Sequence, residues 1–392
     1  MPQPVYVIGA GRTDFKRNFR KEGKSIRDII VEAGTGAIAD SGIQPRDVQS
    51  GVVGNFASGL FTRQLHLGSF LVEIDEGLLG IPTMHVEAAC ASGGAAVLTA
   101  AHQIMSGAHD VVLIVGAEQQ KTMSPADGSD VLGAAADYHA ERSIYGDFMF
   151  PKLFARIADT YMKRYGLTER QLAQVAVKNY ANAKRNPQAQ TRDINLTLDQ
   201  ACVESEANPR IAPPLKISDC SQITDGGAAI VLCSGTFLRR FSSPKRAVRL
   251  LGFGHTTDHL PLERKSIPEF PIARAAARQA YDMARLSPRD IHAADVHDCF
   301  SISEILAYEI LGFADPGQGP RFINTGIPIN PGGGLIGDGH PVGATGVRQV
   351  VEACAHLTES AGARQVPAAK RYLTFNMGGS VTTSVVMIWG TE

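Results

Sequence analysis

An internal repeat constrains the fold of this chain more than any other feature of its sequence. The segment VYVIGAGRT at residues 5–13 recurs as VRLLGFGHT at residues 248–256, an offset of 243. At the same offset, PRDV at residues 45–48 recurs as PRDI at residues 288–291. Between these anchors both copies hold an alanine-rich pattern that predicts a helix. Two motifs on one ungapped offset indicate a duplicated unit of strands and helices.

The two copies continue in the same order. A glycine-rich turn leads into a predicted helix at 90–107 and at 340–357, and a strand-like run follows at 110–118 and at 371–379. Strands that alternate with helices favour mainly parallel sheets covered by helices. Residues 121–225 have no counterpart in the second copy. An excursion of that length inside a compact domain is usually functional.

We therefore expect three parts in the chain. Residues 1–120 form the first half, and a strand at about 226–245 returns to complete it. Residues 121–225 form an inserted loop domain that contributes to substrate binding, and residues 246–392 form the second half.

Charge and hydropathy exclude several classes of function. A formal net charge of −1 over 392 residues predicts no general attraction to nucleic acid or to an anionic membrane. No run approaches the roughly 18 apolar residues that a membrane span needs. The first residues show no charged-then-apolar leader, so we expect a cytoplasmic protein. Six cysteines without a C-x-x-C pair indicate reduced thiols rather than a disulfide framework.

The first candidate catalytic residue is Cys90. It ends the apolar approach HVEAAC and is followed by ASGGAA, which places it at a strand-to-helix turn. A thiol at a helix N-terminus meets free backbone N–H groups and the helix dipole, which lower its pKa and favour the thiolate. The alternative is an unreactive cysteine of the core.

The second candidate is His340, which lies in NPGGGLIGDGHPVGATG at residues 330–346. So many glycines are entropically costly, and they predict tight backbone geometry around this histidine directly before a helix. A base that deprotonates a thiol must be held within hydrogen-bond reach of it. The alternative is a turn-rich loop with an incidental histidine.

The third pattern is VHDCFSISE at residues 296–304. A short apolar run ends in His297 and Cys299 and then enters a helix, with Ser301 and Glu304 spaced as a capping box. Proteins with alternating strands and helices tend to place active sites at such strand ends. Packing at a strand end together with a helix cap remains an equally good interpretation of this pattern alone.

Together these patterns resemble the thiolase superfamily over essentially the whole chain, and most closely its sterol-carrier-protein-2 type. The matching stretches are ACASGG around Cys90, HDCF at 297–300 and GHPVGATG at 339–346, supported by EQQKTMS at 118–124 and PLKISDCSQITDGGAA at 214–229. The resemblance implies the α/β thiolase fold, a five-layered αβαβα arrangement of two related halves with an inserted loop domain. It also implies a homodimer or homotetramer, and it leaves an auxiliary protein subunit open.

The resemblance further implies a thiolase-type acyltransferase that cleaves 3-oxoacyl-CoA or condenses acetyl-CoA in reverse. His340 would deprotonate Cys90, which would carry the acyl group, and Cys299 would be the acid or base at the α-carbon. His297 and His340 would bind the enolate oxygen with a water. Backbone N–H groups of Cys90 and Gly378 would bind the tetrahedral oxyanion. Acyl-CoA and CoA would be substrates, and no metal or permanently bound cofactor is expected.

One position departs from the wider family. Thiolases outside this subgroup carry a reactive cysteine in a C-x-G motif near the C-terminus, where this chain has FNMGG at 375–379. An asparagine side chain cannot exchange a proton at physiological pH, because its amide does not titrate. We therefore assign proton transfer at the α-carbon to Cys299.

Candidate CoA contacts come from two sources. Residues 151–192 carry nine lysines or arginines, Lys184 and Arg185 among them, and this local excess is suited to binding nucleotide phosphates. Solvated helix faces are the alternative for any one of them. Met123 and Ser221 lie in family-like stretches and are candidates for contacts with pantetheine.

Two other functions fit part of the sequence. Another condensing enzyme of the superfamily would also use a cysteine nucleophile, but it would pair that residue with two histidines or a histidine and an asparagine rather than with Cys299. A non-catalytic acyl-CoA-binding subunit of a complex would need none of these side chains.

Overall fold

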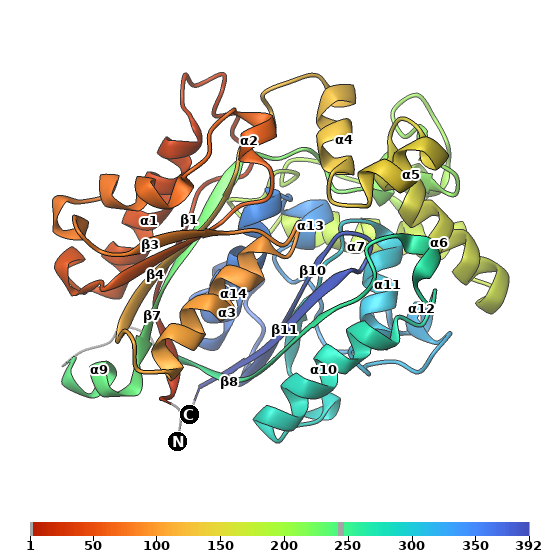
Figure 1. The fold of residues 1–392 in the computed structure, drawn as a ribbon. Coiled ribbons are helices and arrows are strands. Elements are labelled where there is room, and N and C mark those ends of the chain that lie inside the picture. The colour runs from red at the N-terminus through yellow and green to blue at the C-terminus, as the bar shows by residue number, and fades with distance from the viewer. Residues whose placement is uncertain (1–2, 242–246, 392) are drawn as a thin grey trace.

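The computed structural model describes residues 3–241 and 247–391 (Figure 1). Nine strands form one sheet in the order β3-β2-β4-β7-β1-β8-β11-β10-β9. Their bounds are β1 (Val5–Arg12), β2 (Ser50–Gly54), β3 (Thr83–Val86), β4 (Val111–Glu118), β7 (Gly226–Ser234), β8 (Val248–Thr257), β9 (Ala293–Asp295), β10 (Arg371–Gly378) and β11 (Thr383–Gly390). A separate pair holds β5 (Arg210–Ala212) and β6 (Leu215–Lys216).

Fourteen helices are present in the described residues. They are α1 (Ile26–Ser41), α2 (Ser58–Phe61), α3 (Ser92–Met105), α4 (Pro125–Gly133), α5 (Tyr138–Tyr145), α6 (Met149–Tyr165), α7 (Glu169–Ala183), α8 (Leu198–Cys202), α9 (Gly235–Arg240), α10 (Pro271–Ala284), α11 (Ser301–Ile310), α12 (Gly319–Phe322), α13 (Gly334–Gly337) and α14 (Thr345–Leu357). None of these described helices is long and apolar enough to cross a bilayer.

The sheet and the helices are arranged in layers. On β4, Val111 and Val115 face a core shared with α1, whereas Val112 and Ile114 face a core shared with α3 and α14. Alternate residues of a strand point to opposite faces, so helices cover both faces of each half of the sheet. Helices α3 and α14 lie together in the middle, and α10 packs on the far side of β8 and β11. This arrangement confirms the expected α/β fold class. The prediction of mainly parallel pairing was wrong, because five of the eight strand pairs in the sheet are antiparallel.

The repeat in the sequence appears as a local two-fold axis. Strands β1 and β8 pair antiparallel, with Tyr6 opposite Arg249, its own equivalent at the offset of 243. From this junction the order outward is β7-β4-β2-β3 on one side and β11-β10-β9 on the other, so the first side has β3 as an additional edge strand. The PRD motifs form matching single-turn 3₁₀ helices at Pro45–Asp47 and Pro288–Asp290. The two halves are therefore built alike and joined edge to edge.

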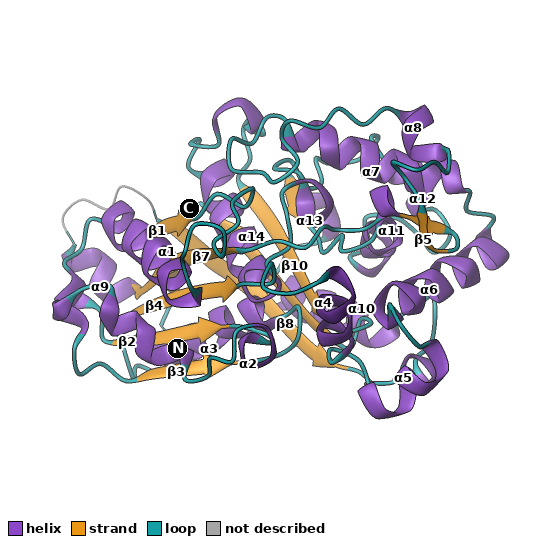
Figure 2. Cartoon of the chain, turned by 90° about the horizontal axis from the view of Figure 1, so that it is seen from above, coloured by secondary structure: helices purple, strands orange, loops and turns teal. Residues whose placement is uncertain are grey.

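The inserted segment holds α4 to α8 and the small β5–β6 pair, and it contributes no strand to the nine-stranded sheet. Figure 2 shows α5, α6 and α8 at the end of the molecule away from α9.

The returning strand is shorter than expected. Strand β7 ends at Ser234, whose hydroxyl accepts from the N–H of Phe237 and caps α9. The rest of the predicted strand and the boundary at 246 reach into 242–246, outside the described residues. The domain boundaries remain a prediction.

Candidate active site

Cys90 lies in the turn between β3 and α3, two residues before the helix begins. The preceding residue, Ala89, has a φ of 51°, a left-handed conformation that is uncommon for a residue with a Cβ. The hydroxyl of Ser92 stabilises this turn, since it accepts from the N–H of Ala88 at 2.9 Å and donates to the carbonyl of Ala89 at 2.6 Å. The turn thus holds Cys90 in one position at the start of α3.

His340 occupies the equivalent turn before α14. Its N–H donates to the hydroxyl of Thr224 at 3.0 Å, and its carbonyl accepts from the side chain of Gln120 at 2.7 Å. Its Nδ1 lies 2.6 Å from the hydroxyl oxygen of Thr345. That hydroxyl donates its one proton to the carbonyl of Pro341, so its oxygen accepts from Nδ1–H. The neutral ring therefore keeps a lone pair on Nε2, which suits it to accept a proton.

His297 follows β9 and faces His340 edge-on, with ring centroids 5.1 Å apart and the planes at 88°. Its Nδ1 lies 3.1 Å from the side-chain nitrogen of Asn376 on β10. Its Nε2 is buried, and no hydrogen-bond partner for it exists among the described residues. A buried polar atom without a hydrogen-bond partner is unfavourable, so its presence calls for an explanation such as a role in binding or catalysis. His297 is 1% exposed and does not itself line the cavity beside Cys90, so this nitrogen lies behind the lining of that cavity.

The three side chains Cys90, His297 and His340 form one cluster, in which the sulfur and one nitrogen of each ring lie within 4.8 Å of one another. A cavity of about 240 Å³ opens onto it and is lined by both Cys90 and Cys299 together with His340. Cys299 has its sulfur 3.6 Å from the hydroxyl of Ser303. The remaining lining is mostly apolar and comes from the insertion, including Leu132, Phe148, Phe150, Ile211 and Ile217.

Burial sets the protonation states in this cluster. It raises the pKa of the Cys90 thiol to about 12, with a further contribution from the negative charge of Glu118. The expected lowering by the start of α3 is outweighed, because a thiolate without water loses more solvation than the helix end returns. Burial likewise lowers the pKa of His340 to about 3, with Arg348 acting in the same direction. The resting pair is a neutral thiol beside a neutral imidazole.

Two backbone N–H groups act on the sulfur of Cys90. Hydrogen bonds from Gly379 and from Cys90 itself lower the pKa of the thiol, whereas Gly378 stays a predicted donor to the tetrahedral oxyanion. Gly378 packs against the Cys90 turn so closely that a Cβ there would lie 2.2 Å from the carbonyl oxygen of Ala88. Gly378 thus permits the close approach of β10 to the turn that carries Cys90. The C-terminal NMGG stretch was the sequence signal for both glycines.

Of the four predicted CoA contacts, Ser221 alone lines this cavity. Its N–H donates to the carbonyl of Cys299 at 2.9 Å, which joins the insertion to the HDCF segment. Met123 lines a neighbouring cavity, which shares Phe148 with the first. The structure places Lys184 and Arg185 elsewhere, at the C-terminal end of α7.

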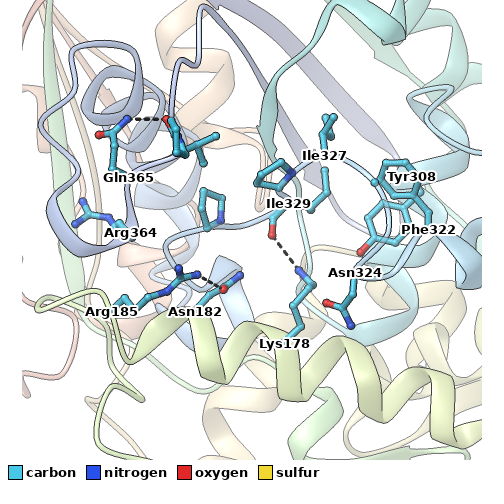
Figure 3. A pocket seen from close by; sticks show the side chains of 15 residues that line it. Lys178, Asn182, Arg185, Tyr308, Phe322, Asn324, Ile327, Ile329, Arg364 and Gln365 are labelled. Atoms are coloured by element: carbon cyan, nitrogen blue, oxygen red, sulfur yellow. Dashed lines mark hydrogen bonds between the residues drawn. The ribbon is translucent and has the colours of Figure 1, made fainter.

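Arg185 lines a separate cavity of about 380 Å³ beside Lys178, Tyr308 and Arg364 (Figure 3). Lys184 donates to the side chain of Asn195 at 3.1 Å. Other basic residues of the insertion are paired with acids from remote segments: Arg156 with Glu263, Arg164 with Glu269, Lys178 with Glu304, and Arg192 with Asp14. Four of the nine basic residues in 151–192 are therefore paired with acids from outside the insertion.

Two further residues take part in the site without having been predicted. Asn376 was recognised only as a missing cysteine, yet it hydrogen-bonds to Cys90 and His297 of the cluster and to Gly94 of α3. The buried carboxylate of Glu118 accepts from the N–H groups of Phe56 at 2.9 Å and Gly343 at 3.0 Å, which ties the end of β2 to the His340 loop. The signal for Glu118 was its place at the end of the strand run 110–118.

The comparisons agree with this geometry. Residues 5–236 match the family model described as the N-terminal domain of thiolase, and residues 254–391 match the model of a thiolase C-terminal domain-like unit. An acetyl-CoA acetyltransferase of Methanothermobacter thermautotrophicus is 39% identical over 98% of this chain and 99% of its own. Human sterol carrier protein 2 is 34% identical over 95% of this chain and 70% of its own. The solved structure "Ltp2-ChsH2(DUF35) aldolase" superposes with a TM-score of 0.83 and 25% identity, covering 100% of this chain and 98% of that one.

Proposed function

This chain belongs to the thiolase family, and from that premise we propose that it transfers acyl groups to and from coenzyme A through an acyl-enzyme on Cys90. It is an acyltransferase of the thiolase type, like the acetyl-CoA acetyltransferases to which it is similar over its whole length. The observation that carries the proposal is the pairing of a thiol and a histidine lone pair at the bottom of one apolar cavity. A buried thiol with a base in reach is the arrangement that covalent acyl transfer requires.

In the cleavage direction, the lone pair on Nε2 of His340 accepts the thiol proton as the sulfur attacks the 3-oxo carbonyl. The bond between the α-carbon and that carbonyl then breaks, which leaves an acyl group on Cys90 and the enolate of acetyl-CoA. Cys299 gives its proton to the α-carbon. The proton held by His340 then returns to the Cys299 thiolate, which leaves the ring neutral again. A CoA thiol, deprotonated by His340, attacks the acyl-cysteine, and the departing Cys90 thiolate takes that proton back from His340. In condensation every step runs in reverse.

Donors for the two developing charges are part of the same proposal. His297 belongs to the cluster, and its Nε2 has no hydrogen-bond partner among the described residues, which supports it as the donor to the enolate oxygen. The tetrahedral oxyanion would be bound by the backbone N–H groups of Cys90 and of the Gly378–Gly379 segment. Loss of one such donor typically lowers turnover by about 10²–10³-fold.

Trapping the intermediate tests the function. Protein incubated with radiolabelled acetyl-CoA and quenched in acid is expected to keep label, and Cys90→Ala is expected to keep none. Cys299→Ala should keep label but lose carbon–carbon bond formation by about 10²-fold or more, since general acid–base catalysis contributes that much. Cys354→Ala, a buried cysteine in α14, is the control. Label that persists in Cys90→Ala contradicts the acyl-enzyme assignment.

The aldolase among the similar structures is named together with a DUF35 protein, which supports an auxiliary subunit as part of the proposal. If the isolated chain takes no label but becomes labelled when a DUF35 protein is added, the enzyme needs that partner. No label under either condition supports a non-catalytic acyl-CoA-binding subunit instead.

We also propose a homodimer formed along β3. This strand ends the described sheet, and its residues Met84 and His85 are exposed. An open strand edge with apolar side chains is a template for pairing with another chain. Three nearby apolar side chains, Leu60, Leu65 and Leu79, are also more than half exposed, at 57%, 66% and 68%. Light scattering should give twice the mass of one chain, and Met84→Lys should shift the protein toward the monomer. A monomeric wild-type protein contradicts the proposal.

A further inference from the structure

We propose that Asn376, which stands where other thiolases carry a cysteine, is a positioning residue that fixes His297 as its Nε2–H tautomer. This inference deepens the proposed function and rests on it, because it explains how His297 comes to donate to the enolate oxygen. Asn376 lies on β10 between the Cys90 turn and the HDCF segment, and it is fully buried.

The orientation of the Asn376 amide is determined by two backbone groups. Its oxygen accepts from the N–H of Gly94 at 3.0 Å, and its nitrogen donates to the carbonyl of Cys90 at 2.9 Å. A flipped amide would set oxygen against oxygen at Cys90 and nitrogen against nitrogen at Gly94, so both bonds would be lost. Glycine at two flanking positions allows the approach, since a Cβ on Gly94 or Gly346 would lie 2.8 or 2.3 Å from the amide oxygen. The nitrogen is thereby held toward His297.

This orientation decides where the proton of His297 lies. The amide nitrogen is 3.1 Å from Nδ1, and an amide nitrogen donates but does not accept. Nδ1 must therefore present its lone pair. Burial holds the pKa of His297 well below its usual range, with His340 and Arg348 contributing, so the ring carries a single proton. That proton remains on Nε2, the atom without a partner among the described residues.

The two histidines of the cluster consequently differ in chemistry. Thr345 leaves Nε2 of His340 with a lone pair, and Asn376 leaves Nε2 of His297 with a proton. One ring can accept the Cys90 proton while the other donates to a negative oxygen. The same assignment argues against a metal ion in the cluster, because a metal needs an unprotonated nitrogen from each ring. Asparagine at 376 therefore supports acid–base chemistry without titrating itself.

Nitrogen-15 NMR of histidine-labelled wild-type protein tests the tautomer directly. At neutral pH the Nε2 signal of His297 is expected to show a directly bound proton and the Nδ1 signal none, whereas His340 should show the opposite. The His297→Gln variant identifies the signals among the 11 histidines of the chain. A proton on Nδ1 of His297 overturns the inference. This measurement needs no catalysis, so its result is separate from that of the acetyl-labelling experiment on Cys90.

The Asn376→Asp variant gives a second test through the pH profile. A carboxylate beside Nδ1 draws the single proton of the neutral ring to Nδ1. In the variant, Nε2 of His297 therefore carries a proton only when the ring is doubly protonated. Its carbon–carbon bond-forming rate should therefore fall as pH rises through the raised pKa of His297. The wild-type donor does not titrate in this way. The rate of Cys90 acetylation, which forms no enolate, should fall less than this step. A variant with the wild-type pH profile contradicts the inference.

Asn208→Asp is the matched control. Asn208 is buried, accepts from the N–H of Ser218 at 3.0 Å and donates to the carbonyl of Gln200 at 3.1 Å, but it contacts no histidine. It should lose stability without a new pH dependence. A double variant completes the test: with His297→Ala present, Asn376→Asp should lower turnover by less than about twofold, because neighbours that act through one group are non-additive. Full additivity would show that Asn376 acts independently of His297.

Discussion

Cys90 shows how burial and local structure compete at a single residue. The start of α3 favours a thiolate at this position, yet the cavity around it contains little that could solvate a charge. Burial raises the pKa of the thiol to about 12, which shows that burial is the larger effect in the resting protein. In the proposed mechanism, the thiol therefore becomes nucleophilic only as His340 removes its proton during the reaction, and no ion pair exists in the resting protein.

The pH dependence of alkylation at Cys90 tests this conclusion. With its pKa raised to about 12, the thiolate fraction should grow about tenfold per pH unit and still be rising at pH 10. Peptide mapping after brief exposure to iodoacetamide gives the rate, and the less buried Cys202 in the same digest corrects for the reagent. A rate that levels off near neutral pH would indicate a thiolate–imidazolium pair and contradict the neutral resting state.

The two central helices approach so closely that their first turns are in backbone contact. A Cβ on Gly93 would lie 2.8 Å from the N–H nitrogen of Gly346, and a Cβ on Gly346 would lie 2.1 Å from that of Gly94. This crossing brings together the starts of α3 and α14, and with them the turns that carry Cys90 and His340. Small residues at these positions are therefore required for the site to form, in addition to their effect on helix stability.

Substitution of these glycines should separate packing from helix propensity. Gly346→Ala should lower the free energy of unfolding by about 3 kcal/mol, because a methyl group forced into a filled space displaces backbone. Gly36→Ala in α1 should be neutral or stabilising by up to about 1 kcal/mol, since its Cβ would meet nothing closer than 3.6 Å. Urea unfolding of both variants measures the difference. Equal effects would contradict the close crossing.

At the scale of the whole molecule, buried charges join the two halves. Arg12, at the end of β1, binds Asp338 through two hydrogen bonds of 2.8 Å, and Asp338 lies two residues before His340. Arg348 of α14 lies 3.6 Å from the same carboxylate and pairs with Asp295 at the end of β9. The His340 loop is thus held from both halves of the sheet.

Two arginine–aspartate pairs of nearly equal geometry allow this connection to be tested. Arg12 and Asp338 are 4% and 1% exposed, whereas Arg192 and Asp14 are 24% and 31% exposed. Arg12→Met should lower the free energy of unfolding by about 3 kcal/mol, because it leaves a buried carboxylate poorly paired. Arg192→Met should lower it by less than about 1 kcal/mol. Denaturant unfolding gives both values, and similar losses would contradict a special role for the buried pair.

The sequence by itself determined the features that depend on short stretches. The repeat at an offset of 243 predicted two like halves, and Tyr6 indeed pairs with its equivalent Arg249. The glycine-rich turns and the HDCF segment marked Cys90, His297, Cys299 and His340, because chemistry that needs special backbone geometry leaves a local pattern. The strand runs at 110–118 and 371–379 are present as β4 and β10.

Only the tertiary structure decided what depends on partners from remote segments. The charge of the insertion predicted a phosphate site at Lys184 and Arg185. Acids distant in the chain pair with four of the nine basic residues in 151–192, and Lys184 and Arg185 lie away from the Cys90 cavity. The pKa of Cys90 reverses its expected direction for the same reason, since burial is the sum of many non-local contacts. The proposed role of Asn376 depends on its hydrogen bonds to Gly94, Cys90 and His297. These residues come from two other segments of the chain and meet Asn376 only when the chain folds.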